Sequence, residues 1–336
     1  MALPLPLNRR RALAALCAAP LLSRAAALPG ARSLPATLAQ GRFFLETILS
    51  DGKPARLFTS TSGGMLATLE AGKRLGLALP NPNDRRAATP VAWASLVQDP
   101  RILAPALLPA ATGTATAASP AADLPLAALD GAQKVQLDGA VAWLGAPWFA
   151  HRHWTLDYLS GNIFINPPGT RLPEAEAHRI ALGIASDAQG QRTSAIPTLS
   201  ISVAGETLRM ALDTGASVMP TPAARSRLGA GAASVMGASF ISASIAAAWR
   251  RKNPSWLWLA QADRFSKAAM IRVPTVDIAG HRTGPVWFTV LPDADLGPYL
   301  ADWTDQPVVG AVGGSLLSAF RVTLDYPGAQ AWFETV

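Results

Sequence analysis

One internal repeat constrains the fold of this chain more than any other feature. Residues 51–76 align without a gap on residues 204–229 when the sequence is shifted by 153 positions. Arg56 then falls on Arg209, and both segments end in Arg-Leu-Gly. A fixed offset of this kind is the signature of a repeated structural unit. We therefore expect two similar units along the chain.

A second pair of similar segments follows later in each unit. Residues 138–158 resemble residues 309–326, because Gly-Ala-Val and Thr-Leu-Asp-Tyr recur at their two ends. The first copy carries three extra residues between these ends. Two blocks that repeat in the same order predict the duplication of a domain of about 130–150 residues.

The local pattern within each unit predicts β-structure. Short alternating apolar runs flank dipeptides that favour tight turns, which is typical of hairpins. We expect such turns at Asp51-Gly52, Ala204-Gly205 and Ala279-Gly280, and hairpins at 154–167 and 321–334. Helices are expected to be few and short, at 69–76, 222–229 and 242–254.

Two tryptophans after the last of these helices share one face of an alternating segment. Trp256 and Trp258 lie in the sequence Ser-Trp-Leu-Trp-Leu-Ala. Alternation along a strand places both side chains on the same side. They can pack in the core or line a substrate cleft, and the sequence leaves both interpretations open.

The first 27 residues have the pattern of an export signal. Arg9, Arg10 and Arg11 precede an apolar stretch at 12–22, and Ala25–Ala27 offers a cleavage site. The adjacent arginines suggest twin-arginine export. An apolar stretch this short cannot span a bilayer as a helix, which needs about 20 residues. We expect an exported protein, periplasmic or secreted, with no stable membrane anchor after cleavage.

Removal of this segment changes the charge and the cysteine count. The formal net charge of +7 would fall to +3, since four arginines and no acids precede residue 28. No basic run interleaved with aromatic residues remains, so we expect no nucleic-acid partner. Cys17, the single cysteine, would also be lost. The four histidines are scattered, so we expect no metal site and no cofactor; they are His151, His153, His178 and His281.

At this point the motifs resemble those of a known family. Met-Ala-Leu-Asp-Thr-Gly-Ala-Ser (210–217) is followed by a short helix ending in Arg-Leu-Gly, by Val-Val-Gly (308–310) and by Phe-Arg-Val-Thr-Leu-Asp-Tyr-Pro-Gly (320–328). This series resembles the retropepsin-like and pepsin-like aspartic proteases found among exported bacterial proteins. The resemblance extends over residues 42–334, in two copies.

The resemblance implies an all-β, bilobal, pepsin-like fold made of two duplicated retropepsin-like β-barrel lobes with a few short helices. On this interpretation residues 28–41 are a linker. Residues 42–170 form the N-terminal lobe and residues 171–336 form the C-terminal lobe, which carries the intact Asp-Thr-Gly motif. The low-complexity segment 104–123 is a candidate exposed loop or flap.

In this family two aspartates, one from each lobe, share a proton and activate a water molecule between them. The resemblance assigns one of these roles to Asp213. It implies that Thr214 braces its loop against the other lobe, that Gly215 permits a tight turn with an amide contact, and that Ser217 bonds to the carboxylate. Thr61, Ser217, Gly139 and Gly310 are the residues it implies for substrate binding.

The repeat locates the position of the expected partner, and the aspartate is missing there. The shift of 153 residues places Asp213 on Ser60, while Thr214 falls on Thr61. Without a neighbouring carboxylate, we expect Asp213 to titrate near the ordinary aspartate pKa of about 3.9. We expect no other acid to replace the lost one; those considered are Asp51, Glu70, Asp138, Asp157 and Asp325.

Three functional hypotheses follow from the resemblance and from this loss. The protein is an aspartic-type endopeptidase with weak or altered activity, or an inactive homologue that binds extended peptides in the interlobe cleft. In the third, two copies each donate Asp213, although the first lobe already occupies the partner position. In all three the partner is a peptide or protein substrate, and apart from the third we expect a monomer.

Overall fold

The computed structural model describes residues 28–79, 89–97, 99, 101–102, 123–173, 178–229, 231 and 233–335. The expected signal peptide lies outside these residues, as does the candidate flap apart from Asp123. Strands predominate in the described part and the helices are short, so the prediction of an all-β class is confirmed. None of the described helices is both long enough and apolar enough to cross a membrane.

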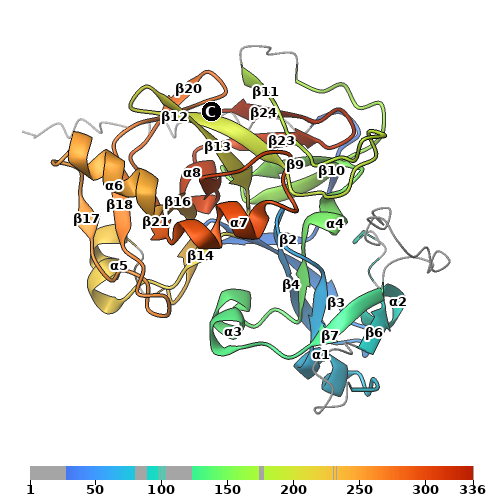
Figure 1. Cartoon of the computed structure of the whole chain (residues 1–336). Coiled ribbons are helices and arrows are strands. Elements are labelled where there is room, and N and C mark those ends of the chain that lie inside the picture. Colours follow the sequence, from blue (N-terminus) through green and yellow to red (C-terminus); the bar gives the residue numbers. More distant parts are fainter. Residues whose placement is uncertain are drawn as a thin grey trace, which may run out of the picture.

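Two large sheets come from the two halves of the sequence (Figure 1). The first has seven strands, in the spatial order β2 (Ala36–Ala39), β3 (Arg42–Ile48), β4 (Pro54–Thr59), β8 (Ala142–Leu144), β5 (Leu66–Thr68), β7 (Asp123–Ala127) and β6 (Thr89–Ala92). The second has nine, in the order β17 (Trp258–Leu259), β18 (Met270–Val273), β21 (Val286–Leu291), β16 (Ser239–Ser242), β22 (Gly310–Val312), β13 (Glu206–Leu212), β12 (Thr198–Val203), β19 (Val276–Ile278) and β20 (His281–Thr283).

The two sheets share the same pattern of strand pairing. In the first, β4 runs parallel to β8, β8 is antiparallel to β5, and β5 is parallel to β7. In the second, β13 runs parallel to β22, β22 is antiparallel to β16, and β16 is parallel to β21. The duplication that was inferred from sequence identities is therefore also present in the topology.

A third sheet joins the two halves. Its six strands follow the order β1 (Arg32–Ser33), β10 (Asn162–Asn166), β9 (His153–Asp157), β23 (Arg321–Asp325), β24 (Gln330–Glu334) and β11 (Arg179–Ala181). At its centre β9 pairs antiparallel with β23, and the hydroxyls of Thr155 and Thr323 lie 3.1 Å apart. A small two-stranded sheet, β14 (Ser217–Val218) with β15 (Met236–Gly237), lies outside the three larger ones.

The helices are connections between strands rather than a layer of their own. They are α1 (Leu69–Arg74), α2 (Trp93–Leu96), α3 (Gly131–Leu137), α4 (Ala146–Phe149), α5 (Pro222–Leu228), α6 (Ala243–Lys252), α7 (Gly297–Leu300) and α8 (Gly314–Leu317), with a 3₁₀ turn at Asp293–Asp295. Thr68 caps α1 and Thr221 caps α5, in each case by accepting from the amide three residues on. These two threonines are also 153 residues apart, so the repeat preserves the helix start as well as the turn.

All three expected dipeptide turns close hairpins, and two of them share one backbone geometry. Ala204-Gly205 joins β12 to β13 and Ala279-Gly280 joins β19 to β20, and all four residues have positive φ. The turn at Asp51-Gly52 differs, because only Gly52 has positive φ there. The chain closes that hairpin over residues 49–53 through a hydrogen bond from the Leu49 amide to the Lys53 carbonyl. The hairpins predicted at 154–167 and 321–334 are confirmed as β9–β10 and β23–β24.

The expected linker, residues 28–41, contains ordered strands. β1 pairs with β10, and β2 pairs with β3. Leu34 between these strands is buried. This segment thus belongs to two of the sheets, which its polar and turn-forming residues do not indicate.

The helix expected at 242–254 is confirmed as α6, which ends with Asn253 as its C-cap. Trp256 packs against the main core and against Trp249 of this helix. Trp258 stacks against the guanidinium of Arg250 at 4.2 Å. For Trp256 the structure thus favours core packing over a place in a substrate cleft.

An aromatic cluster anchors α4 beneath the six-stranded sheet. Trp148, Phe149 and Trp154 are fully buried, and the rings of Trp148 and Trp154 lie 4.4 Å apart between centroids. The indole of Trp154 also donates to the Phe149 carbonyl at 2.9 Å. Trp154 therefore contributes a large buried surface together with a satisfied polar group.

Replacement of Trp154 by alanine is expected to lower the free energy of unfolding by about 3–5 kcal/mol, because it leaves a large cavity. Denaturant unfolding followed by circular dichroism measures this change. Leu257→Ala is the control, since Leu257 is 53% exposed and its loss should cost less than about 0.5 kcal/mol. Equal stability of the two variants would contradict the packing described above.

Candidate active site and cleft

Two loops, one from each large sheet, meet through reciprocal hydrogen bonds. The Thr61 amide donates to Thr214 Oγ1 at 3.0 Å, and the Thr214 amide donates to Thr61 Oγ1 at 3.1 Å. Thr61 follows β4 and Thr214 follows β13, the equivalent strand of the other sheet. The two residues that the sequence repeat aligns are thus neighbours in space, related by an approximate twofold arrangement.

Both threonines are buried, which makes their hydrogen bonds important for stability. Thr61 is completely inaccessible to solvent, and its hydroxyl also donates to the Leu212 carbonyl at 2.7 Å. Removal of one partner would leave the other polar groups buried without hydrogen bonds, which is more costly than losing an exposed contact. The expected bracing role of Thr214 agrees with this arrangement, although Thr61 braces the loops and is not exposed for substrate binding.

Asp213 and Ser60 face each other at the centre of this contact. Ser60 Oγ donates to Asp213 Oδ1 at 2.8 Å, and the Gly215 amide donates to the same oxygen at 3.0 Å. The Ser62 amide in turn donates to Ser60 Oγ at 3.1 Å. Each central side chain therefore accepts from the amide two residues on, so Ser60 occupies the position equivalent to Asp213.

Gly215 allows the two loops to approach this closely. A Cβ atom at Gly215 would lie 2.5 Å from the Cβ and 2.6 Å from the Oγ of Ser60. Any larger residue would push the two loops apart. The expected amide contact of Gly215 is confirmed. A glycine is required at this position because Ser60 leaves no room for a side chain.

The pKa of Asp213 is raised above its ordinary value, chiefly because burial disfavours the charged carboxylate. Hydrogen bonds from Ser60 and from the amides of Gly215 and Ala216 act in the opposite direction and are too weak to offset burial. The expectation of an ordinary titration near 3.9 is therefore wrong. That expectation was based only on the absence of a second carboxylate. It did not include the effect of burial, which removes water from Asp213 and raises its pKa.

The remaining predicted site residues are only partly brought together. Ser217 lines the cleft beside Asp213, but its hydroxyl donates to the Gly215 carbonyl at 2.7 Å rather than to the carboxylate. Gly310 packs inside the second sheet, where a Cβ would lie 2.3 Å from the Phe240 carbonyl oxygen. Gly139 occupies the turn after α3 with positive φ. Neither glycine lines the cleft that holds Asp213.

The cleft above Asp213 has a volume of about 500 Å³. On the side of the first sheet it is lined by the loop Ser62–Gly64 and by Gln136, Trp143, Ala146 and Pro147. On the side of the second sheet it is lined by Ser194–Ile196, Ala216, Ser217, Phe240, Leu300 and Trp303. Asp213 is half-buried at its floor, whereas Ser60 is fully buried below it.

Sequence reasoning did not identify the apolar walls of this cleft. Trp303 and Leu300 come from the segment around α7, which lies between β21 and β22 as α3 lies between β7 and β8 in the first half. Asp305 fixes that segment through an ion pair with Arg209 at 2.7 Å and a short hydrogen bond from Thr198. The only sequence feature that could have indicated this wall is Trp303 itself, which stands among polar residues. A single tryptophan does not show where its side chain lies in the fold.

The other acids considered do not supply a second carboxylate. Asp51 pairs with Arg74 at 2.7 Å, which lowers its pKa to about 2. Asp138 lies 3.7 Å from Arg42. Asp157 accepts from the amides of Leu159 and Ser160 in the turn after β9. Asp325 accepts from the Gly328 amide and pairs with His153 at 3.0 Å. Glu70 lies in the first turn of α1 and does not line the cleft.

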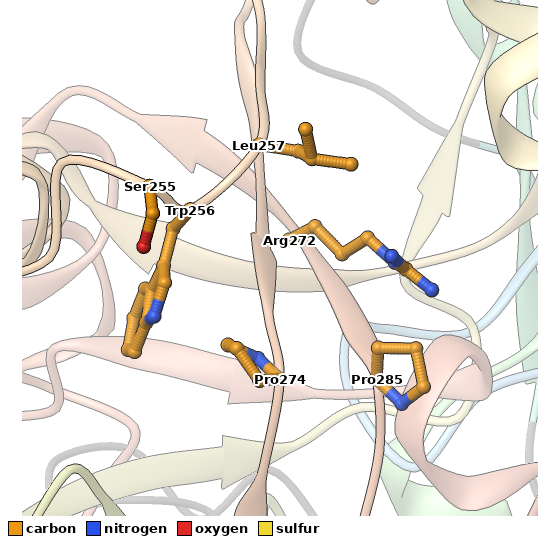
Figure 2. Close-up of a pocket in the computed structure, with 6 residues that line it drawn as sticks. All are labelled: Ser255, Trp256, Leu257, Arg272, Pro274 and Pro285. Atoms are coloured by element: carbon orange, nitrogen blue, oxygen red, sulfur yellow. The ribbon is translucent and has the colours of Figure 1, made fainter.

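Another hollow, of about 380 Å³, lies beside the turn that follows α6 (Figure 2). Figure 2 shows Trp256 and Ser255 on one side and Arg272 and Pro285 on the other. This hollow shares no lining residue with the cleft above Asp213. It contains no acid that could act with Asp213.

Comparison with known proteins adds no assignment to this geometry. No protein-family model matches the chain, and no curated protein matches it. The functional interpretation therefore depends on the residues and on the structure.

Thr61→Val is expected to lower the free energy of unfolding by about 2–4 kcal/mol, because it leaves the Leu212 carbonyl and the Thr214 amide buried without this partner. Thr37→Val is the matched control, since the Thr37 hydroxyl makes an exposed hydrogen bond to Glu46 at 2.8 Å. Its cost should be below about 0.5 kcal/mol. Denaturant unfolding compares the two, and equal costs would contradict the bracing role.

Proposed function

We propose that the two large sheets are the lobes of a pepsin-like aspartic protease fold and that the cleft between them binds an extended peptide. Three observations support the fold. The Asp-Thr-Gly loop follows a hairpin, the strand before it runs parallel to β22, and its threonine exchanges hydrogen bonds with the equivalent threonine of the other half. The duplicated strand topology of the two large sheets also supports this fold.

The cleft suits a peptide in extended form. Gly63 and Gly64 line one side of the cleft and Ser194–Ile196 line the other, and a peptide added as a strand would pair with backbone groups of such edge segments. Trp143, Phe240 and Trp303 supply apolar surface for alternate side chains. Binding of a peptide is thus supported on both sides of Asp213.

Hydrolysis of the bound peptide is expected to be inefficient. An aspartic protease needs one carboxylate that takes a proton from water and one carboxylic acid that gives a proton to the scissile carbonyl. Here the second position holds Ser60, and its single hydroxyl proton is already donated to Asp213. This hydrogen bond, between a hydroxyl and a lone carboxylate, is the observation that carries the proposal.

Slow hydrolysis is the second candidate function. Asp213 is exposed to the cleft in part, and its raised pKa makes it a better base toward water than an ordinary aspartate. A lone general base can assist attack by water, yet it leaves the carbonyl without a proton donor. The resulting activity would be that of a weak aspartic-type endopeptidase.

Ser60→Asp is expected to restore a carboxylate pair and raise the rate of peptide hydrolysis at about pH 3–6 by at least about 10²-fold. Cleavage of a mixed peptide library, followed by mass spectrometry, measures the gain. Ser60→Asn is the matched control, because it has nearly the same size and no acid. The double variant Ser60→Asp/Asp213→Asn should lose the gain.

Three outcomes would contradict the proposal. Efficient cleavage by the wild-type protein that Asp213→Asn abolishes would show that the second carboxylate is not needed. Absence of any gain in a Ser60→Asp variant with a native circular dichroism spectrum would show that the two positions are not arranged as a catalytic pair. Failure of the wild type to retain any peptide would remove the binding function itself.

A further inference from the structure

The cleft has an unusual combination of charge and surface. Among its lining residues Asp213 is the only one with an ionisable side chain. The rest are small, apolar, aromatic or neutral polar residues. A ligand that fills the cleft therefore meets a single carboxylate surrounded by low-polarity walls.

The groups that face this carboxylate are neutral. They are the Ser60 hydroxyl and the amides of Gly215 and Ala216. The Ser60 and Gly215 hydrogen bonds both end on Oδ1. Oδ2 thus keeps lone pairs that a donor from a ligand can use.

Aromatic side chains stand on both sides of the carboxylate. Trp143 comes from β8 of the first sheet, and Phe240 comes from β16 of the second. Trp303, which is 52% exposed, lies at the mouth of the cleft. Aromatic faces attract cations, and the attraction grows when the cation leaves water.

The segment that carries Trp303 adds further negative charge. Residues 293–306 contain four aspartates and no lysine or arginine. Asp305 is paired with Arg209, whereas Asp302 next to Trp303 is exposed. Exposed acids beside a cleft attract a positively charged ligand during encounter.

We propose that the cleft selects peptides that present a positively charged side chain, of the lysine or arginine type, to Asp213 and apolar side chains to the aromatic walls. This inference rests on the proposed peptide-binding function and specifies the ligand class. A neutral peptide would complete the removal of water from the carboxylate without pairing it, which costs free energy. A cationic side chain pairs with Oδ2 and forms a charge-assisted hydrogen bond in the same place.

Isothermal titration of the full chain with three capped pentapeptides tests this selection. The peptides have the sequence Leu-Val-X-Phe-Leu, with lysine, norleucine or glutamate at X. At pH 7 the lysine peptide should bind at least about tenfold more tightly than the norleucine peptide. Norleucine is the more apolar side chain, so the hydrophobic effect alone predicts the reverse order. The glutamate peptide should bind most weakly.

The variant Asp213→Asn should remove the preference for lysine over norleucine. Asp277→Asn is the matched control, because it removes one negative charge from β19 at a residue that does not line the cleft. It should leave the preference unchanged. The preference in the wild type should also disappear as the pH falls through the pKa of Asp213, since the neutral acid no longer attracts a cation.

The outcomes separate this inference from the proposed function. If the norleucine peptide binds as tightly as the lysine peptide, or if the preference survives in Asp213→Asn or at pH 3, the selection for a cation is wrong and peptide binding stands. If none of the three peptides binds a protein with a native spectrum, and the wild type retains no member of the mixed library, the peptide-binding function is wrong.

Discussion

The contact between the Ser60-Thr61 and Asp213-Thr214 loops is the interaction on which the site depends. Paired threonines hold the ends of β4 and β13 together by three buried hydrogen bonds. The six-stranded sheet fixes the same two halves through β9 and β23. Because the loops are held at two places, the central side chains face each other at hydrogen-bond distance, and Gly215 is needed for that approach.

A serine at the position equivalent to Asp213 affects the chemistry of the site more than its structure. The Ser60 hydroxyl donates a hydrogen bond to Asp213 and accepts one from the Ser62 amide, just as Asp213 accepts one from the Gly215 amide. The two loops therefore keep equivalent arrangements. Ser60 is not an ionisable group that could share a proton with Asp213. The protein environment then governs Asp213, and burial raises the pKa of its carboxyl. The cleft is a site with one carboxylate between aromatic walls, which we propose to be better suited to binding than to acid–base catalysis on a peptide.

Much of the fold and the centre of the site followed from the sequence. The register of the repeat alone paired Ser60 with Asp213 and Thr61 with Thr214, because duplicated units place equivalent loops about a common axis. The cleft walls did not follow, since Trp303 and Phe240 come from segments outside the repeated motifs. The strands at 32–33 and 36–39 were missed because short edge strands lack a full alternating pattern. The pKa of Asp213 was misjudged because burial is a property of the whole fold.

The state of the Asp213 carboxyl tests the account most directly. Its ¹³C chemical shift in protein labelled on aspartate, assigned by comparison with Asp213→Asn, can be followed from pH 2 to pH 9. The account predicts a single titration step with a pKa above the ordinary value of about 3.9. In Ser60→Ala the pKa should rise further, since the hydrogen bond that favours the charged form is lost. Two coupled steps, or a single step at or below the ordinary pKa, would contradict a lone, partly buried carboxylate at the centre of the cleft.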